Sequence, residues 1–378
     1  MHAGAGPLSG LLVADFTRVL SGPFATMMLA DLGARVVKVE RPGSGDDSRA
    51  YGPFADGRSL YFARVNRGKQ SLVLDLRDDA DLRIARCLAG RADVLVENFR
   101  PGVMDRLGLG WADLQPVHPG LVYCSISGFG HYGPWRERAA YDAVVQAMSG
   151  IMAVTGVADG PAVKPGVPVA DLSAGLYAFG AIASALIGRG RTGVGTHLDL
   201  AMYDATVSLL EGAALSWLAT GQDPGRMGNA HFSIAPFDTF GCEDDEITIC
   251  AANDVLFGVL VMALDRPQLA ADPRFVSNAA RHASRAALKE ELERTLKGAP
   301  AAHWLAVLER AGVPAGPIST VSEAVGSEQT RARNMVITAG GLAVPGNPVK
   351  ASAYEDPSVR PAAPELDEHG AELRREFG

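Results

Sequence analysis

The feature that most constrains the fold is an alternation of short β-rich runs with helical segments along the first half of the chain. The β-rich runs are residues 11–16, 35–40, 71–76, 93–98 and 121–127. Helical patterns over residues 23–32 and 78–90 separate several of them, with Pro23 at the predicted start of the first helix. Apolar strands joined through helices pair in parallel, and both faces of their sheet are covered. We therefore expect a doubly wound α/β domain.

Changes in composition divide the remainder of the chain. A strand at residues 196–201 and a long helix at 203–220 close the first domain, and the Gly- and Pro-rich residues 221–228 follow as a linker. Residues 312–317 form a second break of the same kind. The predicted parts are a large domain at residues 1–220, a smaller α/β domain at 225–320 and a Pro-rich, irregular C-terminal segment at 321–378.

The predicted small domain combines two strands with amphipathic helices. Its strands cover residues 237–240 and 246–251, on either side of an acidic turn, and its helices include residues 286–296 and 301–311. The chain contains no internal repeat.

Composition narrows the functional classes. A net charge of −8 disfavours binding to nucleic acid or to an anionic membrane. The four cysteines are widely spaced and form no C-x-x-C pair, which is typical of buried thiols in a reducing compartment. The eight histidines show no metal-ligand spacing, so we expect no metal site. A cytoplasmic protein is expected.

The nearly apolar residues 169–187 require a choice between a membrane span and a core helix. The stretch carries Asp171 and ends at a Gly- and Arg-containing run, so we predict a buried helix. That run, residues 188–193, has the form G-x-G-x-x-G. It follows a predicted helix and precedes a strand, the reverse of the dinucleotide-binding context. We interpret it as a turn and expect no dehydrogenase.

Asp171 itself has two compatible interpretations. It stands between an extended, Pro-containing run and the apolar helix, where an aspartate is a favoured N-cap. A carboxylate at a helix N-terminus in apolar surroundings can also be held ionised by backbone amides. Such a carboxylate can attack a thioester. The residues alone leave both roles open.

Arginines occupy several loops that follow predicted strands. Arg18, Arg41 and Arg100 each lie next to a strand end, and Arg138 follows the Gly-rich loop at residues 128–134. In a parallel sheet, ligands bind at the carboxyl ends of the strands. Guanidinium groups gathered there would bind a phosphate-bearing ligand through paired hydrogen bonds.

Five runs together resemble a known family. They are residues 15–46, 96–111, 125–134, 140–150 and 168–178. In combination they are similar to the class III CoA-transferases, the formyl-CoA transferase and carnitine CoA-transferase (CaiB–BaiF) type. The superfamily also includes α-methylacyl-CoA racemase. The similarity extends from Leu8 to Pro357.

The resemblance implies a fold and an assembly. Members have a large Rossmann-like domain, built from both ends of the chain, and a small domain that long linkers join to it. Two ring-like chains interlock as an obligate homodimer. The substrates implied are an acyl-CoA and a small carboxylic acid, with no tightly bound cofactor and no nucleic-acid or membrane partner.

The resemblance also implies a mechanism. Asp171 would attack the donor thioester, and the mixed anhydride would give an aspartyl-CoA thioester that the acceptor carboxylate then attacks. Oxyanion and substrate contacts are expected from Gly130, His131, Tyr141 and Asp142. Succinyl-CoA is a candidate donor and a small dicarboxylate a candidate acceptor.

Contacts with CoA transfer onto matching motif positions. These are Val19, Arg41, Leu74, Asn98, Phe99, Arg100 and Arg106. Where formyl-CoA transferases have a lysine this chain has Ala139, so that contact is lost or passes to Arg138. Leu20 replaces a glutamine near the acyl group, so an oxalate/formyl substrate pair is not expected.

Three other functions compete with transfer. In the racemase branch a histidine is the second base, and here Tyr141 stands in its place, with a hydroxyl pKa too high for proton shuttling near neutral pH. Racemase activity would again be the expected function if His131 reached the α-carbon of the substrate. A CoA-thioester hydrolase and a CoA-binding protein without turnover are the remaining alternatives.

Overall fold

The computed structural model describes residues 6–378. Two compact units divide the chain. The first comprises the chain up to Met152 together with Lys164–Gly221 and Ser327–Gly378, and the second comprises Ala153–Val163 and Gln222–Gly326. The second unit thus contains all of the predicted small domain and also a short segment, Ala153–Val163, that the sequence analysis placed in the large one.

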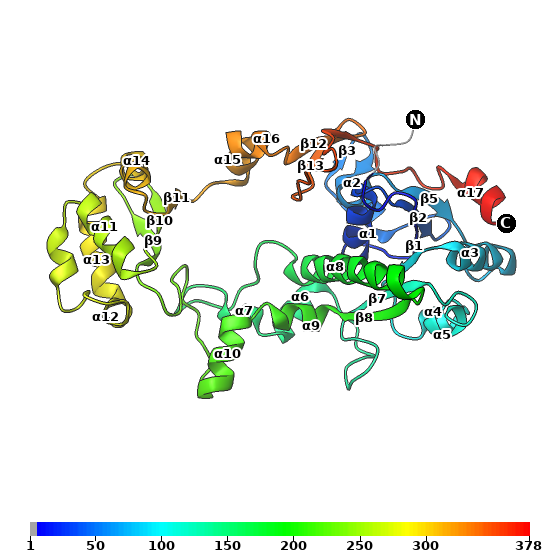
Figure 1. The fold of residues 1–378 in the computed structure, drawn as a ribbon, viewed down its shortest axis with the longest axis horizontal. Helices are drawn as coiled ribbons and strands as arrows, with labels where there is room; N and C mark the ends of the chain where they lie inside the picture. The colour runs from blue at the N-terminus through cyan, green and yellow to red at the C-terminus, as the bar shows by residue number, and fades with distance from the viewer. Residues whose placement is uncertain (1–5) are drawn as a thin grey trace. The chain divides into compact units, whose positions relative to one another are not determined.

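A six-stranded parallel sheet forms the centre of the first unit (Figure 1), in the order β5-β2-β1-β6-β7-β8. Its strands are β1 (Leu12–Asp15), β2 (Arg35–Glu40), β5 (Gln70–Val73), β6 (Val94–Glu97), β7 (Val122–Ser127) and β8 (Thr196–Ala201). The predicted mixed α/β fold with a parallel sheet is confirmed. Strands β2 and β5, which follow β1 in the chain, extend the sheet on one side of β1. Strands β7 and β8, which follow β6, extend it on the other side. The loops after β1 and β6 therefore border the crevice where such sheets bind ligands.

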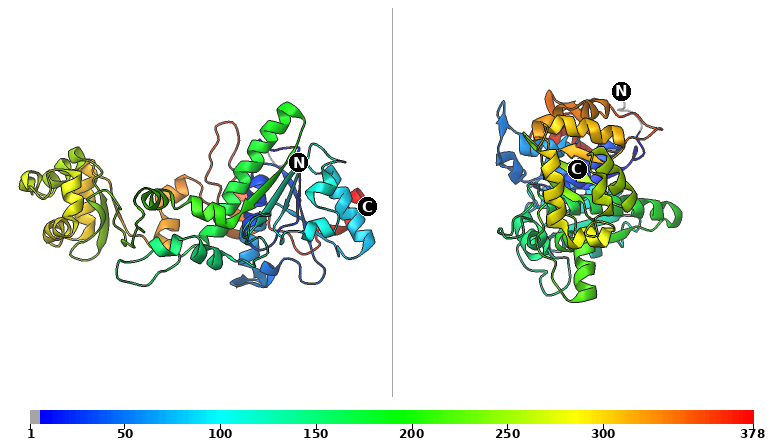
Figure 2. Two further views of the ribbon diagram at one scale, coloured as in Figure 1. Left: turned by 90° about the horizontal axis from the view of Figure 1, so that it is seen from below. Right: turned by 90° about the vertical axis from the view of Figure 1, so that its left-hand side faces the viewer.

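Helices cover both faces of the sheet (Figures 1 and 2). On one face, α1 (Ser21–Asp31) and α8 (Val169–Thr192) pack against β1, β2, β6 and β7. On the other face, α3 (Asp79–Arg91) and α17 (Gly370–Phe377) complete a second apolar cluster. The near-continuous burial of the strands follows from this double cover, as in other parallel sheets.

Several helix predictions need correction. Helix α1 begins at Ser21, so Pro23 is its third residue. The predicted helix over residues 203–220 is two helices, α9 (Met202–Ser208) and α10 (Glu211–Thr220), separated by a break at Leu209 and Leu210.

Helix α8 is longer than predicted. Its residues 188–192 are still helical, and Gly193 ends it with a φ of 72°, so the G-x-G-x-x-G run is mostly helix and not a turn. Arg189 near this end pairs with Asp93 at 3.0 Å, which anchors the last turns. By length and composition alone α8 could cross a membrane. One face of α8 packs in the apolar core against the sheet, and another face is exposed. The prediction of a buried helix is therefore confirmed only for the packed face.

The C-terminal segment is not irregular, contrary to the prediction. Strands β12 (Val336–Ala339), β13 (Leu342–Pro345) and β14 (Val359–Arg360) form a small sheet. Leu373 and Phe377 of α17 are buried against the central sheet. Because α17 has only eight residues, its apolar pattern is too short to detect by periodicity.

The second unit has an antiparallel sheet covered by helices. Its strand order is β11-β10-β9, with β11 (Ala315–Pro317) formed by the predicted break at residues 312–317. The other elements are β9 (Phe237–Gly241), β10 (Glu246–Cys250), α11 (Asp254–Ala263), η2 (Pro267–Ala271), α12 (Asn278–Ala283), α13 (Arg285–Leu296), α14 (Ala301–Ala311) and α15 (Val321–Gly326). Their apolar side chains form a core of this unit's own.

Short elements complete the structure. They are η1 (Asp47–Ala50), β3 (Phe54–Ala55), β4 (Arg58–Ser59), α2 (Leu60–Asn66), α4 (Val103–Arg106), α5 (Trp111–Leu114), α6 (Asp142–Met148), α7 (Ile151–Val154) and α16 (Glu328–Ala332).

Candidate active site

A pocket opens where the strand order of the central sheet reverses. Its walls come from the loops after β1, β6 and β7, and the first turn of α8 contributes Asp171. The predicted residues that line it are Val19, Asn98, Phe99, Arg100, Arg138, Tyr141 and Asp171. The structure therefore brings most of the expected CoA contacts and the expected nucleophile together in one cavity.

Asp171 is the third residue of α8 and not its N-cap. The helix begins at Val169, and Pro168 precedes it without a side-chain cap. Asp142 supplies the missing acceptor, because its Oδ1 accepts hydrogen bonds from the backbone N–H groups of Ala170 at 2.9 Å and Asp171 at 3.3 Å. The capping role that sequence analysis offered for Asp171 thus belongs to Asp142.

Burial and the neighbouring Asp142 together determine the ionisation of Asp171. Burial raises the pKa of the Asp171 carboxyl from 3.8 to about 7, and the neighbouring Asp142 carboxylate adds to the rise. A hydrogen bond from the Ser21 side chain and the positive charge of Arg64 act in the opposite direction. The expectation that backbone amides keep Asp171 ionised is therefore wrong. Its carboxyl titrates near neutral pH, with little water around it.

Close packing of α1 against α8 brings Ser21 to Asp171. Gly175, one turn after Asp171, makes this approach possible. A Cβ atom at position 175 would lie 2.8 Å from the Ser21 carbonyl oxygen and 2.9 Å from the Phe24 ring. Only a residue without a side chain fits between the two helices at this point.

The loop after β1 is held in an unusual conformation by buried polar groups. Val19 has a φ of 68°, and its backbone N–H donates to both carboxylate oxygens of Asp46, at 3.1 and 3.2 Å. Lys38, with no exposed side-chain surface, pairs with Asp46 at 2.9 Å and donates to the Thr17 carbonyl at 2.7 Å. This buried pair fixes the wall of the pocket that faces the loop after β6.

Asn98 joins the two loops. Its Oδ1 accepts from the Arg18 backbone N–H and its Nδ2 donates to the Arg18 carbonyl, both at 2.8 Å. The Asn98 amide therefore acts first as a clasp between the loops after β1 and β6. The Arg18 guanidinium lies 5.8 Å from the Phe99 ring centre and pairs with Asp47 at 3.1 Å.

Arginines give the pocket its charge. Arg18, Arg100, Arg136 and Arg138 line it, against the carboxylates of Asp47 and Asp171. Such a set can hold the phosphates of a CoA molecule through bidentate hydrogen bonds. No group of three or more His, Cys, Asp or Glu side chains within residues 6–378 could hold a metal ion.

Three expected CoA contacts lie outside this pocket. Arg41 pairs with Asp47 and lines a neighbouring cavity with Arg18 and Phe99. Leu74 is 1% exposed and its side chain packs in the core of the sheet. Arg106 is exposed at the end of α4.

Gly130 and His131 also lie apart from Asp171. His131 lines a small cavity with Glu97, Ser125 and His197, and its Nε2 is buried without a hydrogen-bond partner, 3.8 Å from Glu97 Oε1. Burial raises the pKa of Glu97 to about 7. Gly130 lines a further, aromatic cavity. Neither residue is among those that line the pocket of Asp171, which removes the geometric support for His131 as the second base of a racemase.

Sequence reasoning missed two residues that act on Asp171. Ser21 stood inside the first family-like run, directly before Gly22 and Pro23, and its hydroxyl could have been singled out there. Arg64 carried no signal, because it lies in an ordinary helical stretch and reaches Asp171 only through the fold.

Comparison with known proteins decides the family. The family model described as CoA-transferase family III matches residues 8–370. The chain belongs to CoA-transferase family III. Among its relatives is an acetyl-CoA:oxalate CoA-transferase of Acetobacter aceti, 53% identical over 98% of this chain and 96% of the relative. The human succinyl-CoA:glutarate CoA-transferase is 39% identical over 98% of this chain and 86% of its own length.

A solved structure supports the same assignment. The crystal structure of a CaiB/BaiF family protein from Brucella suis superposes with a TM-score of 0.87 at 43% identity, and the match covers 99% of this chain and 100% of that one. The protein is thus a CoA-transferase, an enzyme that uses CoA thioesters as substrates.

Proposed function

We propose that this CoA-transferase uses Asp171 as a covalent nucleophile and moves CoA from an acyl-CoA donor to a small carboxylic acid. The observation that carries the proposal is the state of Asp171. Its carboxyl is largely buried, has a pKa of about 7 and lies in a pocket with four arginines. A desolvated carboxylate is a stronger nucleophile than a hydrated one, and the arginines suit the phosphates of CoA.

The proposed reaction needs no water and no redox partner. Asp171 attacks the thioester carbon of the donor, which forms a mixed anhydride and expels CoA thiolate. The thiolate attacks the Asp171 carbonyl carbon, giving an aspartyl-CoA thioester and the free donor acid. The acceptor carboxylate then displaces the thiolate from the aspartyl thioester, which forms a second anhydride. The thiolate attacks the acceptor carbonyl, releases the product thioester and restores the Asp171 carboxylate.

Names of relatives suggest the acceptor class. Relatives are named for oxalate, glutarate and mesaconate, which are all dicarboxylates. We therefore propose a small dicarboxylate acceptor, with succinyl-CoA or acetyl-CoA as donor. Leu20, which is buried in the pocket wall, argues only against a formyl group. Oxalate belongs among the acceptors to test, because the relative at 53% identity carries it in its name.

Oxygen labelling tests the reaction. An acceptor with an ¹⁸O-labelled carboxylate leaves one labelled oxygen on Asp171 in each turnover, and the donor acid released in a later turnover carries it away. We expect ¹⁸O to appear in the released donor acid after several turnovers in unlabelled water. In a second experiment with unlabelled acceptor in H₂¹⁸O, label that enters the released acid only from this water would show a thioester hydrolase. Binding of CoA thioesters without any product would show a non-catalytic protein.

We also propose a homodimer, in which a second copy covers exposed apolar surface of the first unit. Leu215, Trp217 and Leu218 on α10 are at least half exposed, and Leu176 and Ile187 on α8 are also exposed. Two exposed apolar helix faces are unfavourable in a monomer, because soluble monomers rarely leave contiguous apolar surface in contact with water. Light scattering at micromolar concentration is expected to give twice the chain mass of 39.6 kDa. A stable, active monomer would contradict the proposal.

A further inference from the structure

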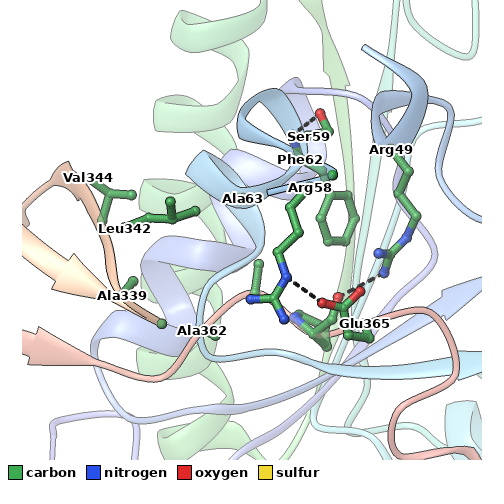
Figure 3. A pocket seen from close by; sticks show the side chains of 14 residues that line it. Arg49, Arg58, Ser59, Phe62, Ala63, Ala339, Leu342, Val344, Ala362 and Glu365 are labelled. Carbon is green, nitrogen blue, oxygen red and sulfur yellow. Dashed lines mark hydrogen bonds and ion pairs between the residues drawn. The ribbon is translucent and has the colours of Figure 1, made fainter. Parts of the chain in front are cut away.

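Helix α2 presents two different faces. The Ser59 hydroxyl caps it by accepting from the Phe62 backbone N–H at 3.1 Å. Phe62 and Ala63 line a cavity shared with the C-terminal segment (Figure 3). Tyr61 and Arg64 are three residues apart, a spacing that puts them on one face of the helix, and neither lines this cavity.

The side of α2 with Arg64 adjoins the first turn of α8. Val65 and Leu172, which directly follow Arg64 and Asp171 in the sequence, pack in one apolar cluster with Leu20. The positive charge of Arg64 is close enough to lower the pKa of the Asp171 carboxyl. The two side chains form no ion pair within 4.0 Å, so the Arg64 guanidinium is not neutralised by Asp171.

Arg64 differs from the other arginines around α2. Those are each matched with a carboxylate: Arg49 with Glu40, Arg58 with Glu365 and Arg67 with Asp31. Figure 3 shows the pair of Arg58 and Glu365. Within residues 6–378 no acidic side chain forms an ion pair with Arg64, and its Nε is buried without a hydrogen-bond partner.

The Arg64 guanidinium is also held in place. Its central carbon lies 3.8 Å from the centre of the Tyr61 ring, and Tyr61 is in turn packed edge-on against Tyr51 at 5.5 Å. A stacked guanidinium keeps its planar fork of donors free for a carboxylate. A buried Nε–H without an acceptor is costly unless an anion or another acceptor completes it.

We propose that Arg64 binds the remote carboxylate of a dicarboxylic acceptor while the other carboxylate of that acceptor reacts at Asp171. The inference rests on the proposed role of Asp171 and names the residue that selects the substrate. The remote carboxylate of the acceptor would lie between the Arg64 and Asp171 side chains. A monocarboxylic acid lacks the group that Arg64 holds, so Arg64 acts as a specificity-determining residue.

The test compares two acceptor classes in three variants. With acetyl-CoA as donor, kcat/KM is measured for oxalate, succinate and glutarate and for the monocarboxylate propanoate. Arg64→Met is expected to lower kcat/KM for the best dicarboxylate about 10- to 100-fold, since a hydrogen-bonded charge is lost. The kcat/KM for propanoate should fall far less, and assays at about pH 9, where Asp171 is ionised with or without the Arg64 charge, remove the effect of that charge on the Asp171 pKa. Arg64→Lys should recover part of the loss. Arg58→Met, which removes a paired arginine on the same segment, is the matched control and should not alter the preference.

A hydroxylamine-trapped adduct on Asp171, measured in every variant, separates the two proposals. An adduct in the wild type and in Arg64→Met, with equal losses for both acceptor classes, would overturn the role of Arg64 alone. So would an unchanged dicarboxylate preference, or a wild type that forms the adduct but prefers propanoate. Absence of the adduct in the wild type would instead overturn the proposed function. Thermal unfolding checks each variant, and if Arg64→Met does not fold, Arg64→Lys and Arg64→Gln carry the same comparison.

Discussion

Replacing Asp142 by asparagine separates the two effects that raise the pKa of Asp171. The substitution removes the neighbouring negative charge and leaves burial unchanged. The new side-chain oxygen can still accept from the Ala170 N–H, which now donates to Asp142 at 2.9 Å. The new NH₂ group would face Gln146, whose Nε2 donates to Asp142 at 2.6 Å and whose Oε1 is buried without a partner. A flip of the Gln146 amide satisfies both groups, so we expect the fold to tolerate Asp142→Asn.

The magnitude follows from the causes of the shift. Burial is the largest contribution to the rise of the Asp171 pKa from 3.8 to about 7, and Asp142 is the second. A like charge a few ångströms away is worth about 1 pKa unit. The pKa of Asp171 should therefore fall to roughly 6 in the variant. At pH 6 the ionised fraction would rise from about one tenth to about one half, which is about a fivefold gain.

The assay is the pH profile of kcat/KM, which reports groups of the free enzyme. Because Asp171 must lose its proton to attack, the wild-type value should rise with pH and level off above about 7. In Asp142→Asn the rising limb should move about one unit toward acid, with a somewhat lower plateau because a less basic carboxylate is a weaker nucleophile. An unmoved limb, or a uniform loss of activity at every pH, would refute this reasoning and make Asp142 a direct participant.

Three further predictions concern the frame of the site. Asp171→Asn should leave the protein about 2 kcal/mol more stable than wild type at pH 8 but not at pH 4, as measured by urea unfolding. Folding raises the pKa of the Asp171 carboxyl, so the wild-type protein loses stability as the pH rises from 3.8 to about 7. Gly175→Ala should cost about 1–3 kcal/mol, since its methyl group would lie 2.8 Å from the Ser21 carbonyl oxygen; an unchanged melting temperature would contradict the close packing. Lys38→Met should cost about 3–5 kcal/mol by leaving Asp46 buried and unpaired, and a loss below 1 kcal/mol would show that water reaches the pair.

Sequence patterns identified the strands and singled out Asp171 as the candidate nucleophile, but they did not predict how its carboxyl ionises. The motif around Asp171 placed it at a helix start, and local rules then favoured an N-cap. The actual acceptor is Asp142, which lies 28 residues earlier and meets α8 only through the fold. The carboxylate that takes the helix amides adds its charge to the burial that raises the pKa of the other. A local pattern carries no information on that choice.

The same limit explains Arg64 and the C-terminal segment. Arg64 comes near Asp171 because Val65 and Leu172 share an apolar cluster, although they are more than one hundred residues apart in sequence. Helix α17 and its buried Phe377 were missed because eight residues give too few turns for a periodic pattern. In contrast, strands β2 and β8 were predicted with their observed bounds, since a short run rich in apolar residues that closely follows a glycine is a local signal.

The central claim is that Asp171 carries the acyl group and then CoA. Mass spectrometry tests it most directly, on protein incubated with succinyl-CoA or acetyl-CoA and trapped with hydroxylamine or borohydride, beside Asp171→Ala and with Asp142→Asn as a control that keeps the nucleophile. We predict a modification that maps to the peptide containing Asp171, present in the wild type and in Asp142→Asn and absent in Asp171→Ala. An adduct that persists in Asp171→Ala, or no adduct in a wild type that transfers CoA, would contradict the account.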